Sequence, residues 1–433
     1  MSTRQRILIL GGGFGGIYAA LELEKVLASR DNLDVTLVTR DNFFLFTPML
    51  HEVAACDLDD STIINPLRKL LRRVDTFIGC VERIDVEARC VTVSHGDGHT
   101  HALPYDHLVL ALGCSTNFFG LPGVEASALT MKSLADAVAL RNRLITRLEE
   151  ASSECAAGAR EPLLTFVVAG GGFAGVETMG GINDFAREAI RYYPALHEDH
   201  LRMILVTPDE LILPELGPKL GAYAQRKLAM RGVEIVTHAR VRGIVDGAVE
   251  LTDGRTFPGS TLVWAAGNAA NPRVACLPIP LGGGRVLVNE CLEVPGWPGI
   301  WALGDGALVP DGSSGRFHPP TAQHALREGR VLARNLVATI DGRPVKPFRF
   351  KTLGQLAAIG RRTGVANVFG INFSGFVAWW LWRTIYLSKL PRFEKKVRVA
   401  LDWTLDLWFA KDFACTAHPA PVAADPALEA RAS

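Results

Sequence analysis

The chain has 433 residues and a mass of 46.9 kDa, a length that predicts two or three domains at roughly 150 residues each. Apolar residues make up 48% of the sequence, which excludes a largely disordered chain, and 46 Lys and Arg against 45 Asp and Glu leave no basic excess for binding nucleic acid. The eight scattered cysteines include no Cys-x-x-Cys pair, so neither a disulfide framework nor a metal site is expected.

The first predicted elements are a buried strand, a glycine-rich turn and a helix, at residues 7–10, 11–16 and 17–28. The turn follows the Gly-x-Gly-x-x-Gly pattern and stands between a strand and a helix, the context in which that pattern binds dinucleotides. Gly11 permits the tight turn, Gly13 lets the backbone approach a pyrophosphate, and Gly16 lets the helix pack closely on the strand. The phosphates would then lie on free N–H groups at the helix N-terminus.

A second strand, glycine-rich turn and helix follow at residues 163–169, 170–175 and from 176 onward. Gly170, Gly172 and Gly175 repeat the three positions of the first turn. Each pattern alone also fits a tight turn that binds no ligand. Two copies about 160 residues apart, each after an apolar strand, favour two dinucleotides, most simply a resident flavin and a visiting nicotinamide.

Further strands are predicted where a doubly wound sheet needs them, at residues 34–38, 108–112, 203–206, 261–265 and 300–303. The last of these lies far along the chain from the first turn. It can complete the same sheet if the second dinucleotide-binding domain is inserted in the first. The predicted fold class is therefore α/β, with two Rossmann-like dinucleotide-binding domains of which the second is inserted in the first.

Several motifs resemble those of the two-dinucleotide-binding-domain flavoprotein superfamily. Gly304-Asp305 resembles its second flavin motif, and Gly113 ends a segment similar to its Ala-Thr-Gly linker, with Leu112 in place of Thr. Longer runs resemble the type II NADH dehydrogenases, the single-subunit NADH:quinone oxidoreductases, at residues 44–50, 105–109, 116–123 and 319–325. The resemblance implies an enzyme that passes two electrons from NADH through FAD to a membrane quinone, by hydride transfer to the flavin and without proton pumping.

The resemblance also implies roles for individual residues, and no metal site is among them. The residues expected to bind FAD are Gly11, Gly13, Phe14, Gly15, Gly16, Thr39, Arg40, Thr47, Val81, Ala111, Gly113, Asp305, Ala322 and Gln323. Those expected to bind the nicotinamide cofactor are Gly170, Gly172, Gly175 and Glu177. Glu177 and Gln323 are the expected catalytic residues, with Glu177 as a proton relay at the quinone. The alternative for Glu177 is a carboxylate in the first helical turn, favoured there by the helix dipole.

The chain departs from the family pattern where each dinucleotide-binding domain is expected to bind ribose. Thr39 ends the strand after the first turn in place of an acidic residue, with Asp41 two residues on as a substitute. Thr207 occupies the corresponding place in the second domain, with Asp209 and Glu210 just beyond. A carboxylate at this place binds the ribose 2′-OH and repels a 2′-phosphate, so NADH is the expected donor and NADPH is left open.

A third departure concerns the family's Ala-Gln-x-Ala-x-Gln quinone motif. Gln323 is present, but Arg327 stands at the second Gln position. Its guanidinium is expected either to pair with Glu328 or to polarise a quinone carbonyl, and the alternative is an exposed helical Arg without a catalytic contact.

The chain's mean hydropathy of +0.17 is high for a water-soluble enzyme, and the surplus lies near the C-terminus. Five of the eight Trp fall within thirty residues, at positions 379, 380, 382, 403 and 408. Residues 373–386 are apolar and aromatic, Pro391 ends that segment, and residues 393–413 are expected to form an amphipathic helix. Residues 351–413 contain ten Lys and Arg against four Asp and Glu, a net charge of +6.

Such a pair of aromatic, basic helices is typical of an interfacial membrane anchor that binds a phospholipid surface. The alternatives are a cap that buries the aromatics on the protein or in a homodimer, and a spanning helix, which Arg383 and Lys389 would interrupt. The expected location is the cytoplasmic face of the cell membrane, peripheral or monotopic. The expected domains are an FAD-binding domain at 1–120 and 285–345, an NAD(P)H-binding domain at 121–284, a membrane-anchoring region at 346–413 and a disordered tail at 414–433.

Two other functions compete with this interpretation. A sulfide:quinone-type oxidoreductase also lies on membranes, but that class uses cysteines beside the flavin and has no good nicotinamide turn. A low-turnover NAD(P)H/FAD redox sensor on the membrane is the second alternative, suggested by Thr39, Thr207 and Arg327.

Overall fold

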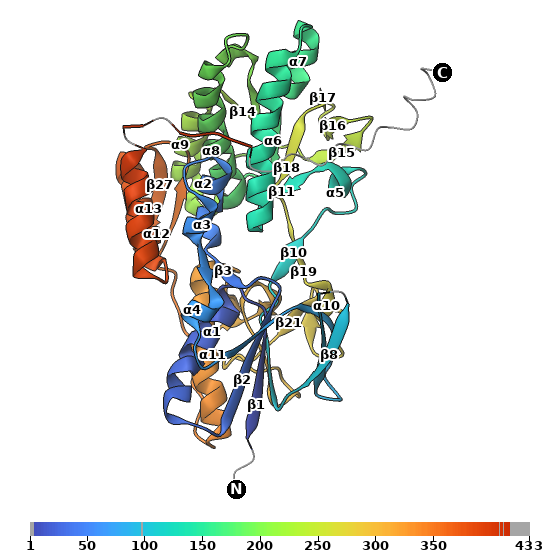
Figure 1. Ribbon diagram of the computed structural model, residues 1–433, viewed down its shortest axis with the longest axis vertical. Coiled ribbons are helices and arrows are strands. Elements are labelled where there is room, and N and C mark those ends of the chain that lie inside the picture. Colours follow the sequence, from blue (N-terminus) through green and yellow to red (C-terminus); the bar gives the residue numbers. More distant parts are fainter. Residues whose placement is uncertain (1–3, 97, 407, 410, 416–433) are drawn as a thin grey trace. The chain divides into compact units, whose positions relative to one another are not determined.

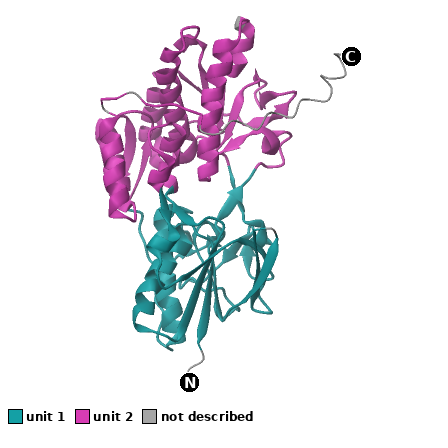
Figure 2. Cartoon of the chain, in the orientation of Figure 1, with its two compact units in different colours: residues 1–46, 64–117, 267–353 teal, residues 47–63, 118–266, 354–433 magenta. Residues whose placement is uncertain are grey.

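The computed structural model describes residues 4–96, 98–406, 408–409 and 411–415, and the chain divides into two compact units (Figures 1 and 2). Unit 1 comprises residues 1–46, 64–117 and 267–353, and unit 2 comprises residues 47–63, 118–266 and 354–433. Most of the predicted tail at 414–433 lies outside the described residues, which end at Cys415. Each unit is described by itself.

Unit 1 is built on a sheet of five parallel strands in the order β22-β9-β1-β2-β5. These strands are β1 (Gln5–Leu10), β2 (Leu33–Thr39), β5 (Asp75–Ile78), β9 (His107–Leu110) and β22 (Ile300–Ala302). Helices α1 (Phe14–Val26) and α11 (Ala322–Ile340) pack against each other on one side of this sheet (Figure 1). The other side bears an antiparallel sheet of β6 (Cys80–Asp85), β7 (Cys90–His95) and β8 (His99–Pro104).

Unit 2 repeats this plan with five parallel strands in the order β11-β18-β12-β13-β14. They are β11 (Leu129–Thr130), β12 (Thr165–Ala169), β13 (Arg202–Val206), β14 (Val233–Val236) and β18 (Thr261–Trp264). Helices α6 (Leu134–Ser153), α8 (Phe173–Ala189) and α9 (Gly217–Ala229) pack on these strands. The antiparallel strands β15 (Val241–Val245), β16 (Ala248–Leu251) and β17 (Thr256–Pro258) share an apolar core with the parallel sheet.

The segment of unit 2 at residues 118–266 is flanked by two short strands of unit 1. Strand β10 (Cys114–Thr116) pairs antiparallel with β19 (Asn268–Ala270), after which the chain returns to add β22 to the first sheet. The prediction of two Rossmann-like domains, the second inserted in the first, is thereby confirmed.

In each glycine-rich turn, the backbone at the end of the strand lies very close to the first turn of the helix that follows. Gly11 and Gly170 have φ values of +113° and +125°, a region that side chains other than glycine rarely adopt. A Cβ on Gly16 would lie 1.9 Å from the Gly11 carbonyl oxygen, and a Cβ on Gly175 would lie 1.9 Å from that of Gly170. The glycines therefore permit helices α1 and α8 to begin directly against the ends of β1 and β12.

The C-terminal part of unit 2 contains a sheet as well as the two predicted helices. Strands β26 (Gly354–Ala358), β27 (Gly364–Val368) and β28 (Ile371–Gly375) form an antiparallel meander, so that Phe373 belongs to a strand. Helices α12 (Phe376–Lys389) and α13 (Phe393–Leu405) follow. Among the described residues, no helix is long and apolar enough to cross a membrane.

The prediction that the last helix continues to Phe413 is wrong. Helix α13 ends at Leu405. Just beyond it, Arg361 donates to the Asp406 carbonyl oxygen at 2.6 Å, and the Lys411 ammonium lies 2.5 Å from the Asp57 carboxylate. The expected division of α13 into an apolar and a polar side also fails at Lys395, which is buried and donates to the Ser61 carbonyl at 2.5 Å.

Substitution of Gly175 by alanine is expected to destabilise unit 2. The added Cβ would collide with the backbone oxygen of Gly170, which cannot move without displacing the turn, at a cost of about 1–3 kcal/mol. Gly172→Ala is the matched control, because its Cβ would meet only Glu215 Oε1, at 4.0 Å. Thermal unfolding followed by circular dichroism should show a lower midpoint for Gly175→Ala alone; equal midpoints for the two variants would contradict the packing argument.

Candidate functional site

In unit 1, the residues expected to bind FAD gather at the carboxyl edge of the parallel sheet. The Gly11 N–H donates to the Val38 carbonyl at 2.8 Å, and the Ala111 N–H donates to the Leu10 carbonyl at 2.9 Å. Because all five strands run in the same direction, the segments that follow β1, β2, β9 and β22 meet along this edge. In open α/β sheets ligands bind at such an edge.

The N-terminus of α1 at this edge is open to a ligand. Gly13 is the residue that precedes the helix, and no side chain among the described residues caps the free N–H groups of the first turn. A Cβ on Gly13 would meet no atom within 4 Å, which leaves space against the backbone. The free N–H groups and the helix dipole make this position suited to a pyrophosphate. The Phe14 side chain packs instead among aromatic rings, with its centroid 5.0 Å from Phe44.

Thr39 and Thr207 take equivalent positions in the two units. Thr39 Oγ1 would lie 2.3 Å from a Cβ on Gly12, and Thr207 Oγ1 would lie 2.5 Å from a Cβ on Gly171. Both threonines are buried. Each side chain therefore packs against the glycine turn of its own unit.

Asp305 lies in the turn that follows β22, and two polar side chains form hydrogen bonds with the backbone of this turn. The Arg285 guanidinium donates to the Asp305 carbonyl at 2.9 Å, and the Gly304 N–H donates to Glu328 Oε2 at 2.7 Å. Glu328 is buried, and this burial raises the pKa of its carboxyl group to about 7, against the lowering effect of the Gly304 N–H. Cys114 Sγ lies 3.5 Å from Asp305 Oδ2, so β10 and the Asp305 turn are neighbours.

The structure assigns Arg327 a packing contact. Its guanidinium donates to the Gln323 carbonyl at 2.7 Å and lies over the Phe350 ring, 4.0 Å from the centroid. The expected alternative of a pair with Glu328 is wrong, because Glu328 binds the Gly304 N–H instead. Ala322 and Gln323 form the first turn of α11.

Two of the residues expected to bind FAD lie outside the segments that follow these parallel strands. Arg40 is exposed just after β2, at the carboxyl edge, whereas Val81 lies in β6, paired with Val93. Thr47 begins the segment of unit 2 at residues 47–63, whereas the other expected FAD residues belong to unit 1.

In unit 2, the second glycine turn has the same geometry as the first. The Gly170 N–H donates to the Val206 carbonyl at 2.9 Å, and Gly172 precedes α8 without a side-chain cap on the helix. Glu177 is the fifth residue of α8, so the alternative of a first-turn carboxylate is wrong. Its Oε1 accepts hydrogen bonds from the Ala358 N–H at 3.2 Å and from the Trp382 indole at 3.0 Å.

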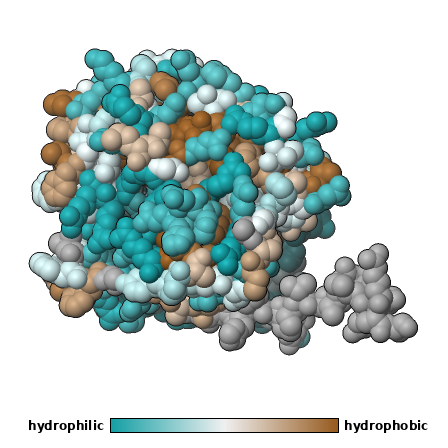
Figure 3. All heavy atoms as spheres, turned by 90° about the horizontal axis from the view of Figure 1, so that it is seen from above, coloured by the Kyte–Doolittle hydropathy of each residue, from teal (hydrophilic) through white to brown (hydrophobic). Residues whose placement is uncertain are grey.

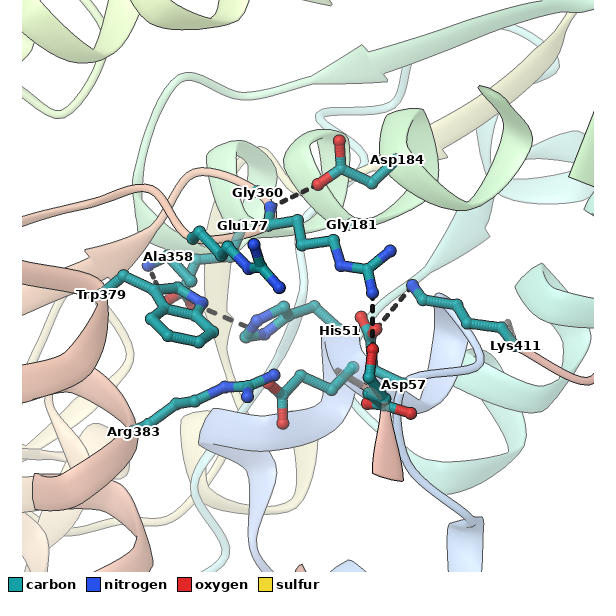
Figure 4. Close-up of a pocket in the computed structure, with 14 residues that line it drawn as sticks. His51, Asp57, Glu177, Gly181, Asp184, Ala358, Gly360, Trp379, Arg383 and Lys411 are labelled. Carbon is teal, nitrogen blue, oxygen red and sulfur yellow. Dashed lines mark hydrogen bonds and ion pairs between the residues drawn. The ribbon is translucent and has the colours of Figure 1, made fainter. Parts of the chain in front are cut away.

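Glu177 lines a pocket within unit 2 with an empty volume of about 550 Å³, open solvent included (Figure 4). Figure 4 shows side chains from α2 (Leu50–Ala54), from α8 and from the C-terminal segments converging on it. Helices α2 and α8 are in close contact here, because a Cβ on Gly181 would lie 3.2 Å from Ala55 Cβ and 3.4 Å from the His51 carbonyl oxygen. Other residues that line the pocket are Asp57, Asp184, Arg361, Arg383, Asp406 and Lys411.

A second buried glutamate, Glu52, lines the same pocket, and the sequence analysis did not single it out. Its Oε2 accepts a hydrogen bond from the Trp403 indole at 3.2 Å. The available signal was a carboxylate inside the short apolar run at residues 50–55, where an unpaired charge would be costly.

Burial dominates the electrostatics of this pocket. It raises the pKa of Glu177 to about 8, against the hydrogen bonds from Ala358 and Trp382, and it raises the pKa of Glu52 to about 8, against the attraction of Arg383. Burial lowers the pKa of His51 to about 4, so His51 is neutral at pH 7. The 3.9 Å approach of His51 Nδ1 to Glu177 Oε2 is therefore a polar contact rather than an ion pair.

Comparison with known proteins agrees with this arrangement. Residues 5–329 match the pyridine nucleotide-disulphide oxidoreductase family, and residues 353–412 match the NDH2 C-terminal domain. The type II NADH:quinone oxidoreductase Ndh of Mycobacterium tuberculosis is 33% identical over 93% of this chain and 88% of its own length. The demethylphylloquinone reductase NdbB of Synechocystis is 31% identical over 93% of this chain and 96% of its own. NDH2 of Plasmodium falciparum in complex with NADH superposes with a TM-score of 0.88 at 20% identity, covering 95% of this chain and all of that one.

Each unit has a parallel sheet, and in each sheet one strand, β1 or β12, leads through an open glycine turn into a helix. These features define the protein as a two-dinucleotide-binding-domain oxidoreductase. The full-length similarity is more specific: the chain belongs to the type II NADH:quinone oxidoreductase family.

The residues present at the edge of the first sheet fit FAD, the flavin cofactor of this family. The uncapped N-terminus of α1 and the open space at Gly13 fit the pyrophosphate. Asp305 lies at the same edge, in the turn that follows β22 in the chain.

Substitution of Gly13 by alanine is expected to weaken FAD binding at least tenfold without unfolding the protein. The methyl group would fill the space available to the cofactor, yet it meets no protein atom within 4 Å, and the φ of −79° suits alanine. Gly158→Ala is the control, since its Cβ also meets nothing within 4 Å. Flavin content after purification and titration of the apoprotein with FAD measure the effect. Wild-type affinity in Gly13→Ala would show that the pyrophosphate does not lie against this residue.

Proposed function

We propose that this chain is an FAD-dependent, non-electrogenic oxidoreductase that passes two electrons from NADH to a membrane quinone. The observation that carries the proposal is the pair of open glycine turns, one in each unit of a chain whose full length resembles enzymes of this activity. The sulfide:quinone and sensor alternatives are not favoured, because the nicotinamide turn is complete and the relatives are quinone reductases.

Bound FAD would supply the two-electron redox chemistry that links the nicotinamide to the quinone. The chain's own residues bind and orient. We propose that Gly11, Gly13 and Gly16 place the FAD pyrophosphate on α1, and that Gly170, Gly172 and Gly175 place that of NADH on α8. Glu177, protonated at pH 7, is proposed to supply a proton to the quinone.

We further propose a preference for NADH over NADPH. Thr207 is fully buried against Gly171, and the exposed acids Asp209 and Glu210 begin two residues after it. This end of β13 therefore presents negative charge, which disfavours the 2′-phosphate of NADPH.

The decisive test is optical and kinetic. The purified protein should be yellow, should bleach when NADH is added without oxygen, and should recover its colour on addition of a short-chain ubiquinone or menaquinone. Steady-state kcat/KM should be at least tenfold higher with NADH than with NADPH. Bleaching without recovery by any quinone would overturn the quinone assignment, and equal kcat/KM for the two donors would overturn the donor preference.

We propose that the protein binds the surface of a phospholipid bilayer through an apolar face on α12 and α13. Apolar side chains that are more than 40% exposed lie along these helices, at Phe376, Val377, Trp380, Phe393, Val397, Leu401 and Leu405. On α13 the exposed apolar residues recur every four positions, so they share one side of the helix. Figure 3 shows apolar groups at the left edge of its face, the side on which Figure 1 draws these helices.

The charge of the region supports an anionic membrane surface as the partner. Residues 351–413 have a net charge of +6, and Lys389, Lys396 and Arg398 lie on the same helices as the apolar face. Basic residues near anionic headgroups contribute about 1 kcal/mol each. We propose the cytoplasmic leaflet of the cell membrane as this surface. The other candidate occupant of the face is a second copy of the chain.

Replacing Trp380 and Phe393 together by serine is expected to reduce binding to anionic vesicles at least tenfold, since each exposed aromatic contributes roughly 1.5–3 kcal/mol on burial. Met230→Ser is the control, because Met230 is 72% exposed in unit 2 but lies outside α12 and α13. Sedimentation with phosphatidylglycerol vesicles measures the change, and gel filtration records the oligomeric state. Unchanged sedimentation with loss of a dimer would assign the face to self-association instead.

A further inference from the structure

A buried carboxyl group contacts the turn that follows β22, at the carboxyl edge of the first sheet. Glu328 of α11 is 2% exposed, and its Oε2 accepts a hydrogen bond from the Gly304 N–H at 2.7 Å. Gly304 begins the turn that contains Asp305. Burying a carboxyl group is costly, and an apolar side chain would fill the same space without that cost. The presence of Glu328 at this position therefore points to a specific task at the turn.

The residue after Glu328 brings α11 against the other FAD-binding element of unit 1. A Cβ on Gly329 would lie 2.4 Å from the Gly15 carbonyl oxygen and 2.9 Å from the Ala19 nitrogen, so α11 packs on the backbone at the start of α1. A Cβ on Gly15 would lie 2.0 Å from Leu303 Cδ1, the side chain just before Gly304. Helix α11 therefore contacts the start of α1 and the Asp305 turn at adjacent positions.

The downstream end of the Asp305 turn is bound independently of α11. Arg285 of β21 (Arg285–Leu287) donates to the Asp305 carbonyl at 2.9 Å and also to the Ala307 carbonyl. A Cβ on Gly306 would lie 3.0 Å from the Gly113 carbonyl oxygen, so the turn also packs against the segment that precedes β10. The Glu328 hydrogen bond is thus the contact that fixes the upstream end of the turn, at Gly304.

We propose that Glu328 is a positioning residue for FAD, because its hydrogen bond to the Gly304 N–H keeps the Asp305 turn at the spacing from α1 that the cofactor requires. The proposal rests on the proposed FAD-dependent function, in which the pyrophosphate lies at Gly13. One cofactor must meet both elements. A displaced turn therefore lowers the affinity for FAD even when each element keeps its own conformation, because the site is no longer preorganised.

The hydrogen bond requires an acceptor at this position but not a negative charge. Burial raises the pKa of Glu328 to about 7, against the Gly304 N–H and Arg285, which lower it, while Asp305 raises it. Both charge states are therefore populated at neutral pH, and each has an oxygen that can accept the bond. Glutamine should replace Glu328 in this role. Aspartate keeps the carboxylate but is one methylene shorter, so it should not reach the Gly304 N–H.

The experiment compares three variants of the full chain, each prepared without flavin and titrated with FAD. Glu328→Gln keeps the acceptor and should bind FAD with a Kd within threefold of the wild type. Glu328→Asp and Glu328→Leu leave the buried Gly304 N–H without this acceptor, so each should raise the Kd at least tenfold. The rate of FAD release, followed by the recovery of flavin fluorescence on dilution, should rise in the same two variants.

Asn335→Leu is the matched control, because Asn335 is another buried polar residue of α11 that binds backbone elsewhere. Its amide donates to the Cys291 and Lys346 carbonyls, at 3.0 and 2.8 Å. Its loss should lower the thermal unfolding midpoint of the flavin-free protein but leave the Kd for FAD within threefold. If Glu328 served stability alone, Glu328→Asp would behave as this control does.

Ligand-induced stabilisation provides a readout that a structural role would not change. Saturating FAD should raise the unfolding midpoint of the wild type, Glu328→Gln and Asn335→Leu by similar amounts, and that of Glu328→Asp by less. The comparison of Gln with Asp keeps the test valid if Glu328→Leu fails to fold.

Wild-type affinity for FAD in Glu328→Asp would overturn the positioning role, and so would a loss of affinity in Glu328→Gln equal to that in Glu328→Asp. If the wild-type protein itself fails to bind FAD, the proposed FAD-dependent function is wrong, which is a different result.

Discussion

The structure depends on two places where a helix begins directly against the end of a strand. At Gly16 and at Gly175 the backbone of the turn occupies the position that a Cβ would take, 1.9 Å away. This approach puts the first free N–H groups of α1 and α8 at the carboxyl edges of their sheets. The uncapped N-termini of these two helices, and the position of Glu177 one turn into α8, depend on this approach.

The features predicted correctly from the sequence are those that local chemistry determines. A glycine turn between an apolar strand and a helix needs no knowledge of distant residues, and two copies of it were enough to predict two similar sheets. The insertion of one domain in the other followed from the late strand at residue 300, which needed a partner sheet. The carboxyl-edge residues Gly11, Ala111 and Asp305 follow from the same topology.

What the sequence could not reveal depends on contacts between distant segments. Glu52 lies 125 positions before Glu177, and only the packing of α2 on α8 puts the two in one pocket. Arg327 stacks on Phe350 because the segment after α11 returns along that helix. No sequence motif indicates this return. Beyond the end of helix α13 at Leu405, Lys411 forms an ion pair with Asp57, more than 350 residues earlier in the chain.

The C-terminal helices bear two sets of aromatic residues with different surroundings, which the sequence did not distinguish. Their tryptophans looked like a single aromatic anchor, yet the structure divides them by side: Trp380 is exposed, whereas Trp382 and Trp403 are buried. The buried indoles donate to Glu177 and Glu52, and the exposed side is the face proposed to meet the bilayer. Because α12 and α13 bear both sets of residues, the helices proposed to meet the bilayer also supply the hydrogen-bond donors to the two buried glutamates of the pocket.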